Sequence, residues 1–430
     1  MGAFAATGML APAVHAAEDH TIRLALIGCG GRGRGAAINA LEGPNQGPVQ
    51  LHALADLTQE KVDFAHRAVA RQFEKQVDAP AARRFVGFEA YKAAIDCLRP
   101  GDVALLTAYA YCRPTHLEYA IEKGVNVFME KSFAPDPGGL NRVLRLGEEA
   151  EKKDLKIAAG LMCRHSVNRQ AMIEKIRAGE LGEVNLARAY RMGRGWKTPF
   201  YRGGENELLW QIRNWIGFFW VSSGLLIEMM IHQADELCWI FDAWPEKAHG
   251  LGGRYDLPDS GGRNFDTYAV EYTFPGGRTG LLNYREAPGG KMDFRTFVHG
   301  TKMAGQFSGH NHKGDVFTFK GKECDPKQVD WQAPPEPRNP WNAEWRVLLD
   351  AIRNNKPHNE TRRAVMANFA AVMGRAAVHT AQEVTWEQAT GSHFRFGPDV
   401  DHMTEKTEPP VKADERGGYP IPVPGTWQEI

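Results

Sequence analysis

The stretch Ile22-Arg-Leu-Ala-Leu-Ile-Gly-Cys-Gly-Gly-Arg-Gly-Arg-Gly35 decides the fold of this chain. Its apolar run from Leu24 to Ile27 predicts a buried parallel strand, and the alternation from about Gly35 to Leu41 predicts a helix. Between them lies the turn Gly28-x-Gly30-x-x-Gly33. A glycine turn that leads from a strand into a helix can bind the pyrophosphate of a dinucleotide, because the helix N-terminus presents free N–H groups and a positive dipole end.

A second predicted strand, Val49 to Asp56, completes this dinucleotide-binding fingerprint with an acid at its carboxyl end. Gly28 would allow the tight turn, Gly30 would let the pyrophosphate approach the backbone, and Gly33 would let the helix lie close to the strand. Asp56 would accept hydrogen bonds from the adenosine ribose and repel a 2′-phosphate, and the next residues, Leu57-Thr58-Gln59, include no cation. The pattern therefore favours NAD over NADP. The predicted cofactor-binding residues are Gly28, Gly30, Gly31, Arg32, Gly33, Asp56, Thr107, Glu130 and Lys131.

The composition is typical of a globular enzyme. At 430 residues the chain exceeds one ordinary core, which predicts two domains. Its 52 basic and 52 acidic side chains balance, so no overall field would draw nucleic acid or an anionic membrane. No apolar run is long enough to span a membrane. The six scattered cysteines form no C-x-x-C pair, which predicts mostly buried free thiols and no metal site.

The first 20 residues differ from the rest of the chain. Ala3 to Val14 is small and apolar, and Val14-His15-Ala16 followed by Ala17 resembles a signal-peptidase site, but no positive segment precedes it. Two interpretations stay open. A shortened export signal of the twin-arginine type predicts a periplasmic protein, whereas a flexible tail predicts a cytoplasmic one.

The order of the predicted elements indicates an α/β protein with two domains and a tail. Residues 21–160 alternate strands and helices, which predicts a Rossmann domain with a doubly wound parallel sheet. Residues 161–404 predict an α/β domain with an open, mostly antiparallel sheet that binds substrate and joins copies of the chain. Residues 405–430 are rich in Pro, Gly and charge and predict an extended C-terminal tail.

These predictions rest on the following elements. In the first domain, the remaining strands are 102–107, 125–129 and 156–160, and the remaining helices are 115–123 and 140–153. In the second domain, the strands are 184–191, 247–252, 266–274, 279–285, 296–300 and 316–319, and the helices are 342–353 and 362–381.

A Glu-Lys pair at the end of a parallel strand is the first candidate for chemistry. Glu130-Lys131 follows the predicted strand 125–129, and in an open α/β sheet that end faces the ligand crevice. Lys131 would hydrogen-bond a substrate hydroxyl and stabilise the negative charge that grows on its oxygen. Glu130 would restrain this lysine or tune its pKa.

Three polar residues within an apolar helix are the second candidate. Spacings of four and three place Glu228, His232 and Asp235 on one helical face. His232 has the pKa range to accept and return a proton near neutral pH, and either carboxylate could orient its ring. The triad lacks a known metal-ligand spacing such as H-E-x-x-H, so we expect no metal.

The aromatic and basic segment from Met192 to Trp220 is the third candidate. Its tryptophans and basic side chains suit a sugar ring, which has apolar faces and many hydroxyls, although packing between domains explains a single Trp equally well. Arg164 and His165, which follow a predicted strand, are further candidates. The predicted substrate-binding residues are Arg164, His165, Trp196, Tyr201, Arg213 and Trp215.

Over residues 21–395 these features resemble the glucose–fructose oxidoreductase / inositol dehydrogenase / rhizopine-catabolism (Gfo/Idh/MocA) family. That family has a Glu-Lys-Pro motif, matched by Glu130-Lys131, and an Asp-x-x-x-His motif after a Gly-Gly turn, matched by Glu228-x-x-x-His232 after Ser223-Gly224. The motifs Gly252-Gly-Arg254, Met373-Gly-Arg375 and Val384-Thr-Trp386 resemble an exported bacterial subgroup. Two departures matter: Ser132 replaces the family proline, and Glu228 replaces the usual aspartate.

The resemblance implies a tightly held NAD, a sugar or cyclitol substrate, and homodimers or homotetramers joined through open sheets. The mechanism it favours is hydride transfer from a sugar ring carbon to C4 of NAD⁺, with His232 taking the hydroxyl proton while Lys131 polarises the oxygen.

Two alternatives stay open. The first is a redox-assisted glycosidase or lyase, in which a resident NAD makes a transient 3-keto sugar, elimination cleaves the glycosidic bond, and the hydride is returned. That scheme needs a tyrosine base, for which Tyr190, Tyr201 and Tyr284 are candidates. The second is a non-catalytic sensor that binds NAD or sugar, which the presence of both Lys131 and His232 disfavours.

Overall fold

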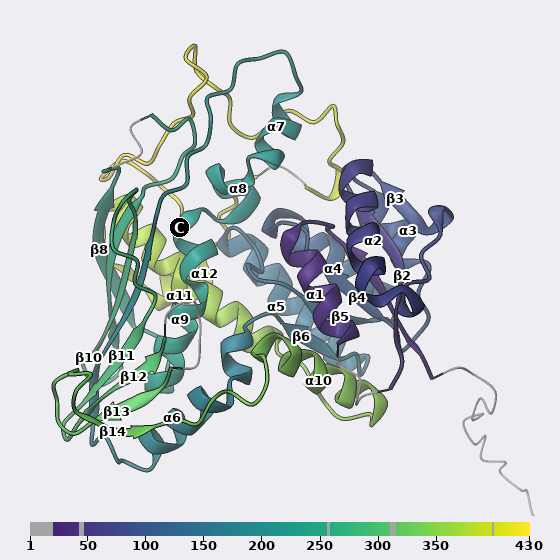
Figure 1. Ribbon diagram of the computed structural model, residues 1–430. Coiled ribbons are helices and arrows are strands. Elements are labelled where there is room, and N and C mark those ends of the chain that lie inside the picture. The colour runs from purple at the N-terminus through teal and green to yellow at the C-terminus, as the bar shows by residue number, and fades with distance from the viewer. Residues whose placement is uncertain (1–19, 43–46, 256–258, 310–314, 398–399) are drawn as a thin grey trace, which may run out of the picture.

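The computed structural model describes residues 20–42, 47–255, 259–309, 315–397 and 400–430. These residues form two β-sheets with helices packed on them (Figure 1). The signal-like segment predicted over residues 1–20 lies outside the described residues except for His20.

Sheet A, which contains the glycine turn, is wholly parallel, and its strand order is β3-β2-β1-β4-β5-β6. The chain winds outward from β1 in both directions, which confirms the predicted doubly wound sheet. Its strands are β1 (Ile22–Ile27), β2 (Val49–Asp56), β3 (Arg84–Val86), β4 (Val103–Leu106), β5 (Asn126–Met129) and β6 (Ile157–Ala159).

Both faces of sheet A are covered by helices, some of which come from far along the chain. One apolar cluster joins the sheet to α1 (Gly31–Leu41), α2 (Gln59–Phe73) and α10 (Pro340–Arg353). The Trp345 ring of α10 stacks on Phe128 of β5 at a centroid distance of 4.3 Å. The cluster on the opposite face includes α3 (Ala90–Ile95), α4 (Arg113–Glu122), α5 (Pro137–Lys152) and α11 (Thr361–Thr380). Helices α10 and α11 thus complete the layers of the first sheet.

Sheet B has nine strands in the order β14-β13-β12-β11-β7-β10-β9-β8-β15. Its pairings are antiparallel except that β10 runs parallel to β7, which confirms the predicted mostly antiparallel sheet. Its strands are β7 (Val184–Gly193), β8 (Lys247–Gly253), β9 (Thr267–Phe274), β10 (Arg278–Glu286), β11 (Thr296–Gly300), β12 (Ala304–Ser308), β13 (Phe317–Phe319), β14 (Val329–Gln332) and β15 (Val384–Thr385).

One long apolar helix, α9 (Leu225–Phe241), lies between the two sheets. Leu226 and Met230 belong to the core of sheet B, whereas Ile227 and Ile231 belong to a core of sheet A. A helix that is apolar on opposite faces is buried on both, so α9 places any polar residue it carries at the junction of the domains. The remaining helices are α6 (Val167–Arg177), α7 (Glu207–Arg213), α8 (Phe219–Ser222) and α12 (Trp386–Gly391), with short 3₁₀ turns η2 (Glu74–Gln76), η3 (Ala81–Arg83), η4 (Ala110–Cys112), η5 (Met162–His165), η6 (Trp215–Gly217) and η8 (Val400–His402).

The C-terminal segment follows the surface but is anchored in the core. In Figure 1 its yellow trace crosses the top of the molecule between the β3 side and the β8 side. The Glu429 side chain is fully buried and accepts hydrogen bonds from Arg375 Nε at 2.8 Å and His379 Nδ1 at 2.9 Å. The predicted tail is therefore part of the folded structure.

All six cysteines are free thiols, and four of them are buried. Within the described ranges, no helix is long and apolar enough to cross a membrane, and no cluster of three or more His, Cys, Asp or Glu could hold a metal ion.

Candidate active site

The glycine turn has the geometry that a dinucleotide requires. Gly28 has a φ of +100°, and a Cβ there would lie 2.3 Å from the Ala108 nitrogen. A Cβ at Gly33 would lie 2.0 Å from the Gly28 oxygen, so the helix can approach the strand only with glycine at this position. A Cβ at Gly30, the N-cap of α1, would meet no atom within 4 Å, which leaves room for a phosphate at the helix N-terminus.

Asp56 is held in place by the turn that it faces. Its Oδ2 accepts from the Cys29 backbone N–H at 2.7 Å and its Oδ1 from the Leu57 N–H at 2.7 Å. A carboxylate has about four acceptor sites, so ribose hydroxyls can still bind. Lys61 Nζ lies 3.7 Å from Asp56 Oδ1. The three residues that follow Asp56 include no cation, so this neighbour was not predicted. Repulsion of a 2′-phosphate by Asp56 would therefore act beside a cation.

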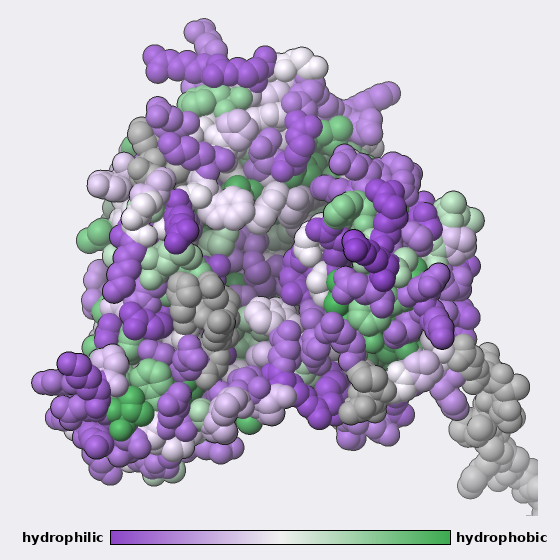
Figure 2. Space-filling view, in the orientation of Figure 1, coloured by the Kyte–Doolittle hydropathy of each residue, from purple (hydrophilic) through white to green (hydrophobic). Residues whose placement is uncertain are grey.

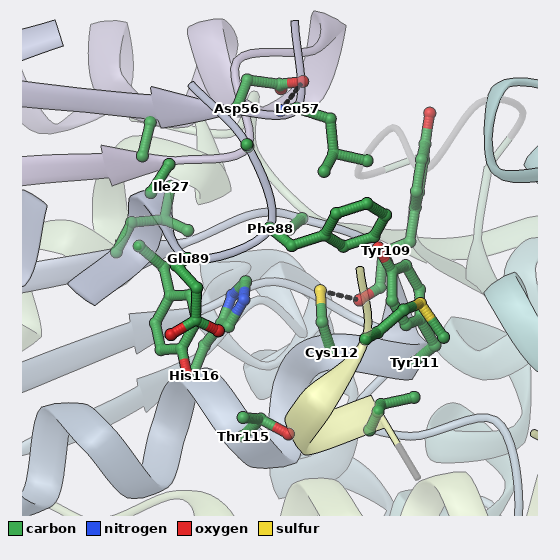
Figure 3. Close-up of a pocket in the computed structure, with 18 of the residues that line it drawn as sticks. Ile27, Asp56, Leu57, Phe88, Glu89, Tyr109, Tyr111, Cys112, Thr115 and His116 are labelled. Atoms are coloured by element: carbon green, nitrogen blue, oxygen red, sulfur yellow. Dashed lines mark hydrogen bonds between the residues drawn. The ribbon is translucent and has the colours of Figure 1, made fainter. Parts of the chain in front are cut away.

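A cavity of about 820 Å³, partly open to solvent, extends from this turn. Figure 3 shows Asp56 and Leu57 at the upper end of it and Cys112 and Thr115 at the lower end. The glycine turn with its acid fits the adenosine and pyrophosphate of a dinucleotide. Further residues that line it, which the sequence did not single out, are Phe88, Glu89, Tyr91, Thr115, His116, Val400, Asp401 and Met403.

Tyr109 connects the cavity to the second domain. Its ring stacks on Trp215 at a centroid distance of 5.1 Å and an interplanar angle of 17°. Burial, with the nearby charges of Asp56 and Glu228, raises the pKa of the Tyr109 phenol, so its hydroxyl stays protonated at neutral pH. Figure 2 shows the surface hollowed between the two domains. Of the predicted sugar-binding residues, Trp215 is the one that contacts the residues of the cofactor cavity through this stack.

Lys131 joins the motifs of the two domains. Its Nζ donates to the Glu228 carboxylate Oε2 at 2.6 Å and to the Glu228 carbonyl oxygen at 2.7 Å. Ser132 Oγ donates to the other carboxylate oxygen of Glu228 at 3.1 Å. The two departures from the family motifs therefore contact each other, because the serine supplies a donor to the longer carboxylate.

His232 lies one helical turn after Glu228 on α9 and is 8% exposed. In an α-helix the carbonyl of residue 228 faces the N–H of residue 232, so the ammonium that contacts this carbonyl lies within about one turn of His232. A cation and an imidazole at the carboxyl edge of sheet A are the groups needed to polarise a hydroxyl and take its proton.

Glu130 has a different partner from the one predicted. Its Oε1 lies 3.0 Å from Arg32 Nε, and its carboxylate covers Gly160, where a Cβ would lie 2.7 Å from Oε2. It thus positions Arg32 of the glycine turn, whereas Glu228 restrains Lys131. Consecutive side chains of an extended segment point to opposite sides, which explains why these neighbours serve different elements.

Asp235 and the two basic residues after β6, Arg164 and His165, each have a partner of opposite charge. Asp235 accepts from Arg164 Nε and Nη2, both at 2.8 Å, and the Arg164 guanidinium also lies over the Trp239 ring. His165 Nε2 lies 3.4 Å from Glu360 Oε1. Burial alone would raise the pKa of Glu360, but His165 and Arg363 outweigh it and hold this pKa well below its usual value. The roles predicted for Arg164 and His165 toward substrate remain predictions.

Three other predicted sugar contacts lie nearer the surface. Trp196 is 49% exposed. The Tyr201 hydroxyl donates to the Glu205 carbonyl at 2.5 Å, and Arg213 pairs with the Glu205 carboxylate. These positions remain predictions as substrate contacts. Of the tyrosines proposed as bases, Tyr284 donates to Glu286 at 2.9 Å, and burial with this carboxylate raises its pKa well above the usual value, which makes it a poor base.

Glu344, on α10, is a buried acid that sequence reasoning missed. It is 1% exposed, and in the described part of the chain neither carboxylate oxygen has a hydrogen-bond partner. Burial raises the pKa of this carboxyl well above its ordinary value, and the negative charge of Glu130 adds to the rise. Burial therefore favours the protonated form of this acid, which lies close to the charges of Glu130 and Arg32.

Replacing Glu344 by Gln is expected to flatten the pH dependence of stability. Above about pH 4.3 the unfolded chain releases this proton while the folded chain keeps it, so the wild type loses up to about 1.4 kcal/mol per pH unit until the folded pKa is reached. The stability of E344Q relative to the wild type should rise between pH 5 and 7, as measured by urea unfolding. The exposed control E323Q should follow the wild type, and parallel profiles for E344Q would contradict the prediction.

The comparisons with known proteins agree with this architecture. Residues 170–304, which include α9 and most of sheet B, match the model of the GFO/IDH/MocA C-terminal domain. The chain carries a GFO/IDH/MocA C-terminal domain. Over these residues the match agrees with the family resemblance inferred from the sequence motifs.

Solved structures share the whole two-domain fold around the GFO/IDH/MocA domain. Aldose-aldose oxidoreductase from Caulobacter crescentus, complexed with glycerol, is 16% identical with a TM-score of 0.65, covering 85% of this chain and all of that chain. Myo-inositol 2-dehydrogenase from Lactobacillus plantarum is 18% identical with a TM-score of 0.64, covering 85% and 99%. Scyllo-inositol dehydrogenase from Lactobacillus casei, with bound NAD(H) and scyllo-inositol, is 17% identical with a TM-score of 0.61, covering 85% and 99%. The comparison with curated proteins found no match.

Proposed function

We propose that this protein is an NAD-dependent oxidoreductase acting on a sugar or glycoside. The observation that carries the proposal is the Lys131–Glu228 contact, which brings the Glu-Lys pair of the Rossmann domain to the histidine helix of the GFO/IDH/MocA domain. Solved structures of the same fold act on aldoses and inositols, and one of them has NAD(H) bound.

In this reaction the residues of the chain would have distinct roles. The glycine turn and Asp56 would bind NAD, which when bound would accept or return a hydride at C4 of its nicotinamide. Lys131 would donate a hydrogen bond to the reacting hydroxyl and stabilise the charge on its oxygen. His232 would take the hydroxyl proton and return it in the reverse direction. Glu228 and Ser132 would hold the Lys131 ammonium in place.

Two further properties are proposed. The family resemblance implies homodimers or homotetramers joined through the open sheet. The molar mass in solution tests this assembly. Export to the periplasm is proposed from residues 1–20 alone.

The first experiment asks whether the cofactor resides in the protein. Protein purified without added cofactor is denatured and any released nucleotide is identified by mass spectrometry, and native protein is screened on free sugars and aryl glycosides. NADH that accumulates with a sugar supports an ordinary dehydrogenase. Stoichiometric NAD, with aglycone release and no net NADH, supports redox-assisted glycoside cleavage instead. A protein that binds neither NAD nor NADH contradicts both.

Replacing Asp56 by Ala is expected to lower the preference for NAD over NADP by about 10-fold or more. The variant loses the acceptor for the ribose hydroxyls, a cost of about 1–3 kcal/mol, while Lys61, 3.7 Å from Asp56, remains to attract a 2′-phosphate. Dissociation constants for NADH and NADPH measure the ratio. The double variant D56A/K61A serves as the control, because it should bind NADPH more weakly than D56A.

A further inference from the structure

The C-terminal segment forms one wall of the cavity assigned above to adenosine and pyrophosphate. Val400, Asp401 and Met403 line this cavity together with Asp56 and Tyr109, which precede them by about 300 residues or more. In Figure 3 the yellow C-terminal ribbon passes beside Thr115 and Cys112. The sequence had assigned residues up to 404 to the second domain, yet these residues contact the first.

The segment is fastened to the Rossmann domain by a charged residue of this wall. The Asp401 carboxylate accepts from Thr115 Oγ1 at 2.5 Å and from Arg142 Nη1 at 2.9 and 3.1 Å. Thr115 itself lines the cavity, so this anchor lies beside the ligand space. Charge-assisted hydrogen bonds are the stronger kind, and Asp401 makes two of them with one guanidinium.

On its other side the segment is fastened to the second domain. Met403 is 3% exposed and packs in one apolar cluster with Tyr111, Trp210 and Trp220. Farther along, the Val411 carbonyl accepts from Gln211 Nε2 at 2.7 Å, and the Ala413 N–H donates to the Glu207 carboxylate at 2.8 Å. The segment therefore crosses from α4 and α5 to α7 and covers the cavity on the way.

We infer that residues 400–403 are part of the dinucleotide site and close over its adenosine half, so that the cofactor leaves only when this segment detaches. The inference rests on the proposed function, because the ligand is the NAD assigned there. Val400 and Met403 would supply apolar contact to a flat adenine, and Asp401 would hold the segment to the domain that binds the pyrophosphate. Release of the cofactor is then limited by breaking the Asp401 and Met403 contacts.

The test measures how fast NADH leaves the intact protein. Wild type, D401A and M403A are loaded with NADH and chased with excess NAD⁺, and the loss of nicotinamide fluorescence gives the dissociation rate. We expect both variants to release NADH at least about 10-fold faster, since each loses contacts of about 1.4 kcal/mol or more. R416A, an exposed residue of the same segment, should release NADH at the wild-type rate.

The outcomes separate this inference from the proposed function. A wild type that binds no NADH overturns both. Stoichiometric binding with wild-type release rates in D401A and M403A overturns the inference alone. Should either variant unfold, D401N and T115V each weaken the Asp401 anchor with little change in shape, and unchanged release in these two would equally overturn it.

Discussion

Alanine at Lys131 or at His232 is expected to lower turnover at least about 100-fold. Lys131 would lose the donor that stabilises charge on the substrate oxygen, and His232 the group that takes the proton, and each kind of contribution is worth about 10²-fold or more. The loss should appear mainly in kcat, and NADH should still bind to both variants, because the glycine turn and Asp56 remain intact. Steady-state kinetics on the sugar identified by the screen, with NADH titrated by fluorescence, measures both.

The matched controls are K327A and H249A, which remove the same side chains from exposed positions on sheet B and its loops. Both should turn over at the wild-type rate. Near-wild-type turnover in K131A and H232A would show that the assigned roles are wrong. A third variant, S132A, should lose less activity than K131A, because it removes one of two donors to Glu228 and leaves the ammonium in place.

Alanine at Glu429 is expected to destabilise the protein by about 3–5 kcal/mol. Its carboxylate pairs with Arg375, which is fully buried, and losing one member of a buried pair leaves the other charge uncompensated. Arg375 also donates to the carbonyls of Pro135 and Ser223, which lie just beyond the Lys131 loop and just before α9. Equilibrium unfolding in urea measures the loss, and E415A, exposed in the same segment, should lie within about 0.5 kcal/mol of the wild type.

The effect of Glu429 should depend on pH in a defined direction. Burial alone would raise its pKa, but Arg375 and His379 outweigh burial and hold the pKa well below its ordinary value. A depressed pKa stabilises the fold above the ordinary value of about 4.3, and the stabilisation is lost as the pH falls below it. The difference in the free energy of unfolding between wild type and E429Q should therefore become smaller as the pH falls from 5 to 3. A difference of constant size would contradict the ion pair.

The parallel sheet was predictable because its strands are buried on both faces and consist of nearly continuous apolar runs. Strand β2 has the bounds that its apolar run predicted. Helix α1 begins at Gly31, not at Gly35, because the turn aligns its first N–H groups despite the poor helix propensity of glycine. The edge strands β14 and β15 and the strand β12 were missed, since they are short or polar and form only by pairing with neighbours in sheet B.

The candidate site was predictable by residue type but not by pairing. Lys131, Glu228 and His232 stood out as polar residues in apolar surroundings, whereas the partner of Lys131 depends on how α9 crosses the first sheet. Asp401 and Met403 could not be identified from the sequence, because nothing local in this short segment indicates which cavity it lines. Glu344 could not be singled out from the sequence, because its burial depends on the packing of α10 against the first sheet.

The return of α10 and α11 to the first sheet has a consequence for synthesis of the chain. Sheet A is complete at Ala159, but its apolar faces are covered in part by Trp345, Leu348 and the α11 residues up to Val372. In a nascent chain the apolar faces of the completed sheet therefore stay partly exposed until more than 200 further residues have been synthesised. Synthesis proceeds at about 5–20 residues per second. The nucleotide-binding half cannot be produced by cutting the chain after β6. It will aggregate unless these two helices are supplied.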